Sequence, residues 1–333
     1  MTAALTTPAA PAARTAGAPR QWRWLARLHR PALIGGGALV LLTAAALVWL
    51  GGPLTDASAA AWKAYNACGF TPRCSYDQDS ILLYKGVYNY TTIAVLAVPF
   101  LVAAWAGGAL VGRETESGTA RLAWTQGVSP ARWLASRLVL PAVLTVAATG
   151  LLAALHRWAW TQGNDSIPTT KFWHDMATFH ANGTVPVGLA LAGLAAGALA
   201  GLLLRRAMAA LAAAAVTVGV LWAAVHAAVP YLWPSVTRVS TLKEGPLGRG
   251  LLVGQGVLTP EGRAEPPCVS GGLDSCRDTL ADMGATAFYR DLHPVSHYWP
   301  LQLVATGILL AVAGLLTYAA FRVLRHSTGT ARG

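Results

Sequence analysis

The feature that most constrains this chain is a set of six long apolar runs separated by polar stretches. Each run has about 20 residues, the length at which an α-helix crosses roughly 30 Å of hydrocarbon. We expect spans at about residues 31–50, 91–112, 134–156, 185–204, 207–229 and 299–321. A membrane barrel would show short alternating segments instead, and only helices or closed barrels satisfy their backbone in lipid. The sequence therefore predicts an all-α integral membrane protein with six transmembrane helices.

Composition supports this fold class, because 54% of the 333 residues are hydrophobic and only 12% are charged. The mean hydropathy of +0.46 is too high for a surface that faces only water. A secretory signal peptide is an alternative explanation of the first run, since Ala57-Ser58-Ala59 resembles a cleavage site. The run is longer than the usual signal-peptide core, which favours a span.

Basic residues near the ends of spans predict the orientation, because short basic loops stay cytoplasmic. With both termini inside, the inner segments hold 14 basic residues and two acidic ones, whereas the outer segments hold 11 basic and 12 acidic residues. We therefore expect a plasma-membrane protein with both termini cytoplasmic. The basic excess is spread over positions next to the membrane, which indicates lipid headgroups as a partner and not nucleic acid.

All four cysteines fall in segments that the charge pattern places outside. In an oxidising compartment, the close pairs Cys68–Cys74 and Cys268–Cys276 are expected to form disulfides. Four cysteines allow three connectivities, so this pairing depends on spacing alone. A zinc site is the weaker alternative, because no convincing pair of histidines accompanies them.

The remaining segments divide the chain into smaller parts. Residues 1–20 are expected to be a disordered cytoplasmic tail, and residues 21–30 an interfacial helix or simply the basic flank of the first span. The residues that suit the membrane interface are Trp22, Arg23, Trp24 and Arg27. Between spans five and six, residues 230–298 predict an extracytoplasmic cap with turn or hairpin content. Spans and cap make up a transmembrane domain over residues 31–321, followed by a cytoplasmic tail over 322–333.

The fourth span carries Gly193, Gly197 and Gly201 at intervals of four residues. This spacing places them on one face of a helix, where small residues let another helix approach closely in lipid. The stripe predicts packing, not catalysis.

Motifs that bind nucleotide or carry out catalysis are absent from the sequence. None of the four lysines follows a glycine, so the chain has no phosphate-binding loop of the Gly-Lys-Ser/Thr type. The histidines His174 and His180 lack the spacing of a helical ligand pair, and an interfacial or loop position is the better explanation. We therefore expect no catalytic, cofactor-binding or metal-binding residues on this chain.

The most informative segment, residues 112–133, joins the second and third spans on the inner side. Gly118 is expected to break a first short helix, Thr119 to cap a second one, and Gly127 to end it. Ser129 then caps the helix of the third span. The pattern predicts a short helix–turn–helix elbow that faces the cytosol.

Glu114, the Gly118-Thr119 pair and the Val128-Ser129-Pro130-Ala131-Arg132 entry into the third span resemble the corresponding loop of ABC-2 type transporter permeases. The six spans, the interfacial helix and residues 293–302 before the last span also resemble six-span exporter permeases of actinobacteria. The resemblance covers most of the chain.

This resemblance implies that the elbow is a coupling helix, which docks in a groove of a separate ABC ATP-binding subunit. The residues at or beside that contact would be Glu114, Gly118, Thr119, Arg121 and Leu122. ATP and Mg would bind to the partner subunit. Members of this family work as two permeases, in a homodimer or a heterodimer, with two ATPases.

The leading hypothesis is a permease subunit of an ATP-driven exporter. Spans that are uncharged and rich in Gly and Ala favour an apolar or amphipathic substrate over a small ion. One alternative is a membrane-embedded enzyme that uses His156, His174 or His180 on a lipid-linked substrate. Another is a membrane-anchored sensory or immunity protein whose cap binds a peptide. Co-purification with an ATP-binding subunit would separate the three.

Overall fold

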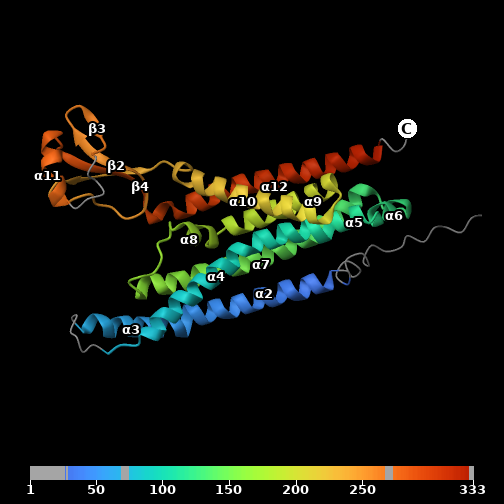
Figure 1. The fold of residues 1–333 in the computed structure, drawn as a ribbon, viewed down its shortest axis with the longest axis horizontal. Coiled ribbons are helices and arrows are strands. Elements are labelled where there is room, and N and C mark those ends of the chain that lie inside the picture. The colour runs from blue at the N-terminus through green and yellow to red at the C-terminus, as the bar shows by residue number, and fades with distance from the viewer. Residues whose placement is uncertain (1–26, 28, 69–74, 267–272, 330–333) are drawn as a thin grey trace, which may run out of the picture.

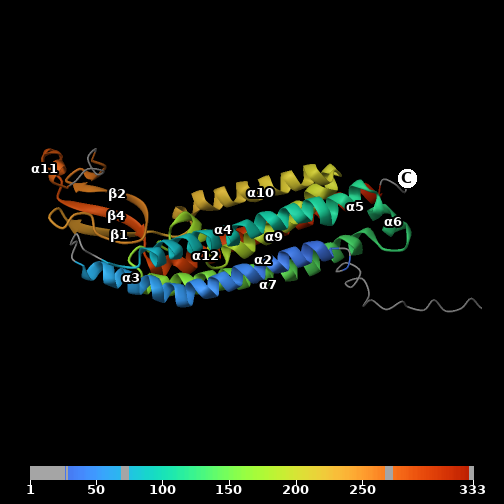
Figure 2. The same ribbon diagram turned by 60° about the horizontal axis from the view of Figure 1, so that its bottom comes forward.

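The computed structural model describes residues 27, 29–68, 75–266 and 273–329. Among these residues, six helices are long and apolar enough to cross a membrane. The helices run lengthwise beside one another, with a small sheet at one end and the short helices α5 and α6 at the other (Figures 1 and 2). We call these the cap end and the elbow end. The chain is a mostly helical, multi-pass membrane protein, as the apolar runs predict.

The spans in the structure are longer than several of the apolar runs. They are α2 with η2 and α3 (Arg30–Trp49, Leu50–Leu54, Thr55–Ala67), α4 with the π-helix η3 (Gln78–Trp105, Ala106–Gly112), α7 (Pro130–Ser166), α9 (Val185–Leu204), α10 with η4 (Ala207–Ala228, Val229–Tyr231) and α12 (Tyr298–Gly329). Helix α12 continues through residues 322–329, which the sequence pattern predicted to be a tail. The helices continue past the apolar runs into polar residues, because a helix still forms its own backbone hydrogen bonds where it leaves the membrane.

Helix α9 lies at the centre of the bundle. In its apolar 18-residue stretch 67% of the residues are buried, compared with 17–39% in the other spans. Its stripe of Gly193, Gly197 and Gly201 faces α4 and η3. A Cβ atom at Gly197 would lie 2.6 Å from both the Ala103 carbonyl oxygen and the Gly107 nitrogen. Backbones meet this closely only where side chains are absent, so these glycines set the distance between the two helices.

The cap is the part of the protein that is not purely helical. Four antiparallel strands form one sheet in the order β1-β4-β2-β3. Their bounds are β1 Val236–Thr241, β2 Leu251–Thr259, β3 Gly262–Ala264 and β4 Ala287–His293, and helix α11 spans Leu273–Asp282. Strands β2 and β3 form the expected hairpin around Pro260-Glu261. Val257, Cys276, Leu280 and Phe288 make a small core of their own between sheet and helix.

Several sequence predictions fall partly on residues outside the described ranges. Neither Cys68 nor Cys276 is a free cysteine. Their expected partners Cys74 and Cys268 lie outside the described residues, so both pairings stay predictions. Arg27 is described and exposed. The other features outside the described residues are the tail over residues 1–20 and Trp22, Arg23 and Trp24.

The segment that follows α7 at the cap end folds back into the bundle. It forms the short helix α8 (Met176–Ala181), in which His180 has an exposed fraction of 0%. The expectation of a loop or interfacial position for His180 was therefore wrong. Gln302 of α12 holds this segment, because its Oε1 accepts the N–H groups of Thr184 and Val185, each at 3.1 Å. Its Nε2 donates to the Phe179 carbonyl oxygen at 2.7 Å.

A second buried contact joins the same segment to α4 and α7. His156 on α7 lies with its Nε2 atom 2.8 Å from Thr92 Oγ1 and its Nδ1 atom against Asn182 Oδ1. The Thr92 hydroxyl also donates to the Tyr88 carbonyl oxygen at 2.7 Å, so both ring nitrogens of His156 lie against side chains that belong to this buried cluster. The cap end of the bundle is thus held by buried polar groups.

Candidate functional site

The elbow consists of the short helices α5 (Arg113–Glu116) and α6 (Thr119–Thr125) and the turn that leads into α7. Gly118 between the two helices has a φ of 74°, in the left-handed region that favours glycine. Gly118 itself occupies the N-cap position of α6, so the expectation that Thr119 is the cap was wrong. The Thr119 hydroxyl instead donates to the Glu114 carbonyl oxygen at 3.3 Å. Ser129 caps α7 as expected, since its Oγ accepts the Arg132 N–H at 3.3 Å.

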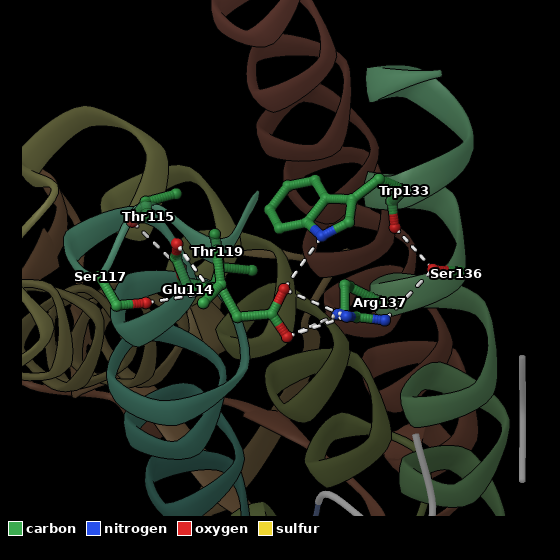
Figure 3. Close-up of polar contacts among 8 residues, drawn as sticks. Glu114, Thr115, Ser117, Thr119, Trp133, Ser136 and Arg137 are labelled. Carbon is green, nitrogen blue, oxygen red and sulfur yellow. Dashed lines mark hydrogen bonds and ion pairs between the residues drawn. The ribbon is translucent and has the colours of Figure 1, made fainter. Parts of the chain in front are cut away.

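The carboxylate of Glu114 points inward, toward α7 (Figure 3). Arg137 donates to it from Nε at 3.0 Å and from Nη2 at 3.1 Å, and the two side chains form an ion pair at 2.9 Å. Trp133 donates from its indole Nε1 to Glu114 Oε2 at 2.9 Å. Glu114 and Arg137 are only 9% and 6% exposed. The pair is therefore buried, and one carboxylate receives donors from two successive turns of α7.

This geometry fixes the angle between the elbow and the third span. Two-pronged Arg–carboxylate contacts are among the strongest and most directional hydrogen bonds in proteins. The Arg137 guanidinium also lies 5.9 Å from the Trp133 ring, and Trp124 of α6 packs edge-on against Trp133 at 5.7 Å. A displacement of α5 or α6 would therefore move α7, or separate the buried Glu114 carboxylate from its donors on α7.

Two further contacts tie the elbow to the tight turn between α9 and α10. The backbone N–H of Ala207, the first residue of α10, donates to Glu116 Oε2 at 2.8 Å. The Thr115 hydroxyl donates to the Gly201 carbonyl oxygen in the last turn of α9 at 3.0 Å. An acidic side chain at a helix N-terminus satisfies an otherwise unpaired N–H group and interacts favourably with the helix dipole. The elbow thus contacts three of the other spans directly.

A comparison with known protein families identifies the family of this chain. The sequence profile described as ABC-2 membrane transporter related matches residues 37–231, more than half of the chain. The chain belongs to this ABC-2 related family. No curated protein and no solved structure matches the chain. The family region contains the elbow, most of the first span and the next four spans, whereas the sheet and α12 lie beyond it.

In this ABC-2 related protein, the residues proposed as the coupling contact divide into two groups. Glu114 faces the interior of the bundle. Arg121 and Leu122 are exposed on α6, and the Leu122 side chain, which is 58% exposed, also lies at the edge of the cavity described below. Gly118 and Thr119 form the turn between the two groups. The elbow therefore has an inner side that is anchored in the bundle and an outer side that is open to a partner.

Sequence reasoning missed the two residues that anchor Glu114. Arg137 lies inside the predicted third span, over residues 134–156, and was considered only as part of the cytoplasmic charge excess. An ionisable residue inside a span is rare, and it was the signal that should have suggested an acidic partner. Trp133 gave no comparable signal, because a tryptophan at the end of a span is ordinary.

His29 lies at the edge of the same site, just before α2. Burial lowers its pKa below the ordinary value, the nearby Glu114 carboxylate raises it, and the Arg137 guanidinium lowers it again. His29 also packs edge-on against Trp105, with ring centroids 5.6 Å apart. The described residues contain no group of three or more His, Cys, Asp or Glu side chains that could hold a metal ion.

Proposed function

We propose that this chain is the permease subunit of an ATP-driven ABC exporter, and that the elbow docks on a separate ATP-binding subunit. The supporting observation is the elbow itself. Its outer side exposes Leu122, while its inner side is anchored to α7 by Glu114 and to the turn before α10 by Glu116. Force applied to α6 would therefore reach several spans at once.

The two sides of α6 give the elbow the properties that a coupling element needs. The outer side is exposed and polar around one apolar side chain, which suits a contact that forms and separates during a cycle. The inner side is rigid because its polar groups are paired at short distances in a buried setting. Membership of the ABC-2 related family supports the same function at the level of the family.

In the proposed assembly, ATP and Mg bind to the partner subunit, and a second permease copy completes the pathway as a homodimer or a heterodimer. The transported substrate is apolar or amphipathic and moves outward. Both termini and the elbow face the cytosol, in agreement with the basic residues that gather at that end of the spans.

The test is to purify the tagged full chain from its native host and measure ATP hydrolysis by any ATP-binding subunit that accompanies it. A Leu122→Glu variant should lose the ATP-binding subunit, because it introduces a charge at the exposed apolar contact. The matched control is Leu247→Glu, which changes a similarly exposed leucine in the cap, 51% exposed, and should retain the subunit. Equal recovery of ATPase activity with both variants would refute the proposed contact.

A further inference from the structure

A cavity of about 860 Å³ lies between the elbow and the start of the first span. Its walls come from residues just before and in α2, from the end of α4 and η3, from α5 and α6, and from the first turns of α7. This volume lies within the range of about 300–1,000 Å³ that is typical of sites for small organic ligands. All the residues that line the cavity belong to one chain.

The apolar part of the wall is large. It includes Pro31, Ala32, Ala109, Ala123 and Val128. A second, much smaller cavity of about 20 Å³ shares His29 and Trp105 with the first and is otherwise lined by apolar side chains. These lining residues are Leu33, Leu110, Leu140, Pro141 and Leu144. The two cavities therefore share part of their walls, and the wall of the smaller one is mostly apolar.

The polar part of the wall includes donor groups that have no partner among the described residues. The Glu114 carboxylate lines the cavity, but it already receives Arg137 and Trp133. Trp105 Nε1, which can only donate, is buried with no hydrogen-bond partner. His29 Nε2 is also buried without a partner, and it can donate or accept depending on the tautomer. Within the described ranges, Arg113 also lines the cavity without an ion pair.

An unpaired indole N–H group in a buried wall costs free energy unless a ligand or water accepts from it. The charges of Glu114 and Arg137 cancel, so among the described residues that line the cavity Arg113 gives the remaining formal charge. A matching ligand would place acceptor oxygens with negative charge near Arg113 and Trp105, and a hydrocarbon chain along the apolar part of the wall.

We propose that this cavity binds an amphipathic anion, a molecule with one acidic phosphate or carboxylate headgroup and a single apolar chain in the cavity. The same chemistry is available from an anionic phospholipid of the surrounding membrane and from a free single-chain amphiphile. That the bound molecule is transported cargo rests on the proposed function, whereas the binding itself does not.

The cavity also shares its wall with the elbow. Ser117, Thr119 and Leu122 line it, so a change in the angle of α6 would change its shape. The affinity of the cavity for a ligand would therefore depend on the position of the elbow, and ligand binding would in turn favour one position of the elbow.

The test uses the purified full chain in phosphatidylcholine nanodiscs and a photoreactive dodecyl phosphate that carries a diazirine near its headgroup. Labelled sites are mapped by mass spectrometry, and the matched probe is the corresponding dodecanol, which partitions into the bilayer without a charge. We expect labelling around Ala109, Leu122 and Ala123, with roughly a tenfold preference for the phosphate probe, the size expected for hydrogen bonds to a charged group.

Two pairs of variants localise the site. Ala109→Trp fills the cavity and should abolish this labelling, whereas Ala212→Trp, at an exposed position on α10, should not. Arg113→Gln should remove the preference for the phosphate probe over the alcohol. Arg132→Gln, which changes an exposed arginine that does not line the cavity, should keep it.

A third comparison identifies the source of the ligand. If an anionic phospholipid is the occupant, replacing part of the phosphatidylcholine with phosphatidylglycerol should reduce labelling by competition. Unchanged labelling would identify a single-chain amphiphile, and both results support the proposed chemistry.

Equal labelling by the two probes, or undiminished labelling of Ala109→Trp, would overturn the proposal. Because Ala109→Trp could disturb folding, Arg113→Gln provides an independent test at an exposed position. The assay contains no ATP-binding subunit, so loss of partner coupling with intact labelling would contradict only the proposed function. Intact coupling without selective labelling would contradict only this inference.

Discussion

The two ends of the bundle hold their short helices against the long spans by different kinds of buried polar contact. At the elbow end, a buried ion pair between Glu114 and Arg137 joins a short, mostly exposed segment to α7. At the cap end, neutral groups such as Gln302 and His156 hold the buried helix α8 among α4, α7, α9 and α12. Neither end relies on apolar packing alone.

The difference shows what each end is suited to do. A buried ion pair loses a large amount of free energy when one partner is removed, so it enforces a single arrangement between two elements that otherwise share few contacts. A neutral network costs less to bury and suits a segment that already has extensive apolar contacts. We therefore expect the elbow to move with α7 as a unit and the cap end to act as a fixed support.

The largest expected effect is at the ion pair. Arg137→Met leaves the buried Glu114 carboxylate with Trp133 as its one remaining side-chain donor in Figure 3, and should destabilise the protein by about 3–5 kcal/mol. Thermal unfolding in detergent, followed by intrinsic fluorescence, measures the loss. The double variant Glu114→Gln with Arg137→Met should recover most of it, and Arg132→Met, at an exposed site, should have little effect. If the double variant were no more stable than Arg137→Met, the unpaired charge of Glu114 would not be the cause of the lost stability.

The cap end should respond to loss of Gln302. Gln302→Leu leaves the N–H groups of Thr184 and Val185 and the Phe179 carbonyl oxygen without their partner, at a cost of about 2–4 kcal/mol. The same unfolding assay applies, and hydrogen exchange should increase over α8. Leu303→Ala, on the lipid-exposed side of α12, is the control. Unchanged exchange in α8 would mean that packing alone holds this segment.

Acid should weaken the cap end through His180. Burial lowers the pKa of His180 from 6.5 to about 4, with a smaller downward contribution from His226. Because the folded state holds the neutral form, stability is complete above about pH 6.5 and is lost as the pH falls toward 4, by up to about 3 kcal/mol. His180→Gln should flatten the dependence of the melting temperature on pH in this window. His174→Gln, at a half-exposed position, should leave most of it, and an unaltered profile in His180→Gln would exclude His180 as the cause.

The smallest effect is expected at the turn of the elbow. Gly118→Ala has open space for its Cβ atom, so its cost comes from the backbone φ of 74° and should be about 1 kcal/mol. Gly150→Ala on α7 also meets no neighbouring atom but lies inside a regular helix, and should be neutral or slightly stabilising. If both variants behaved alike, the left-handed conformation of Gly118 would not be needed.

Most of the membrane fold could be predicted because lipid leaves few choices. Apolar runs of span length indicated six helices, and the structure contains six helices of that kind among its described residues. The order of short helices in the elbow was also visible in Gly118 and Ser129, whose backbone roles are local. The sheet of the cap was less accessible, since its strand order joins β1 to β4 across more than forty residues.

The elbow shows where local reasoning stops. Glu114 was selected as a contact residue on the basis of resemblance, but its direction depends on Arg137, 23 positions further along the chain. His180 was assigned to an interfacial or loop position because its spacing from His174 does not match a helical ligand pair. The structure instead has Gln302, more than a hundred residues away, holding the segment around His180 inside the bundle.

By itself, the sequence determined that the chain crosses a membrane, where its six spans lie, and that a helix–turn–helix joins the second and third. Those features follow from hydrophobicity and backbone preference, which act within a few residues. Only the tertiary structure decided that Glu114 faces inward, that α8 is buried, and that an apolar cavity with unpaired donors lies behind the elbow. Such features arise where distant segments meet, because the pairing of buried polar groups depends on the position of every helix around them.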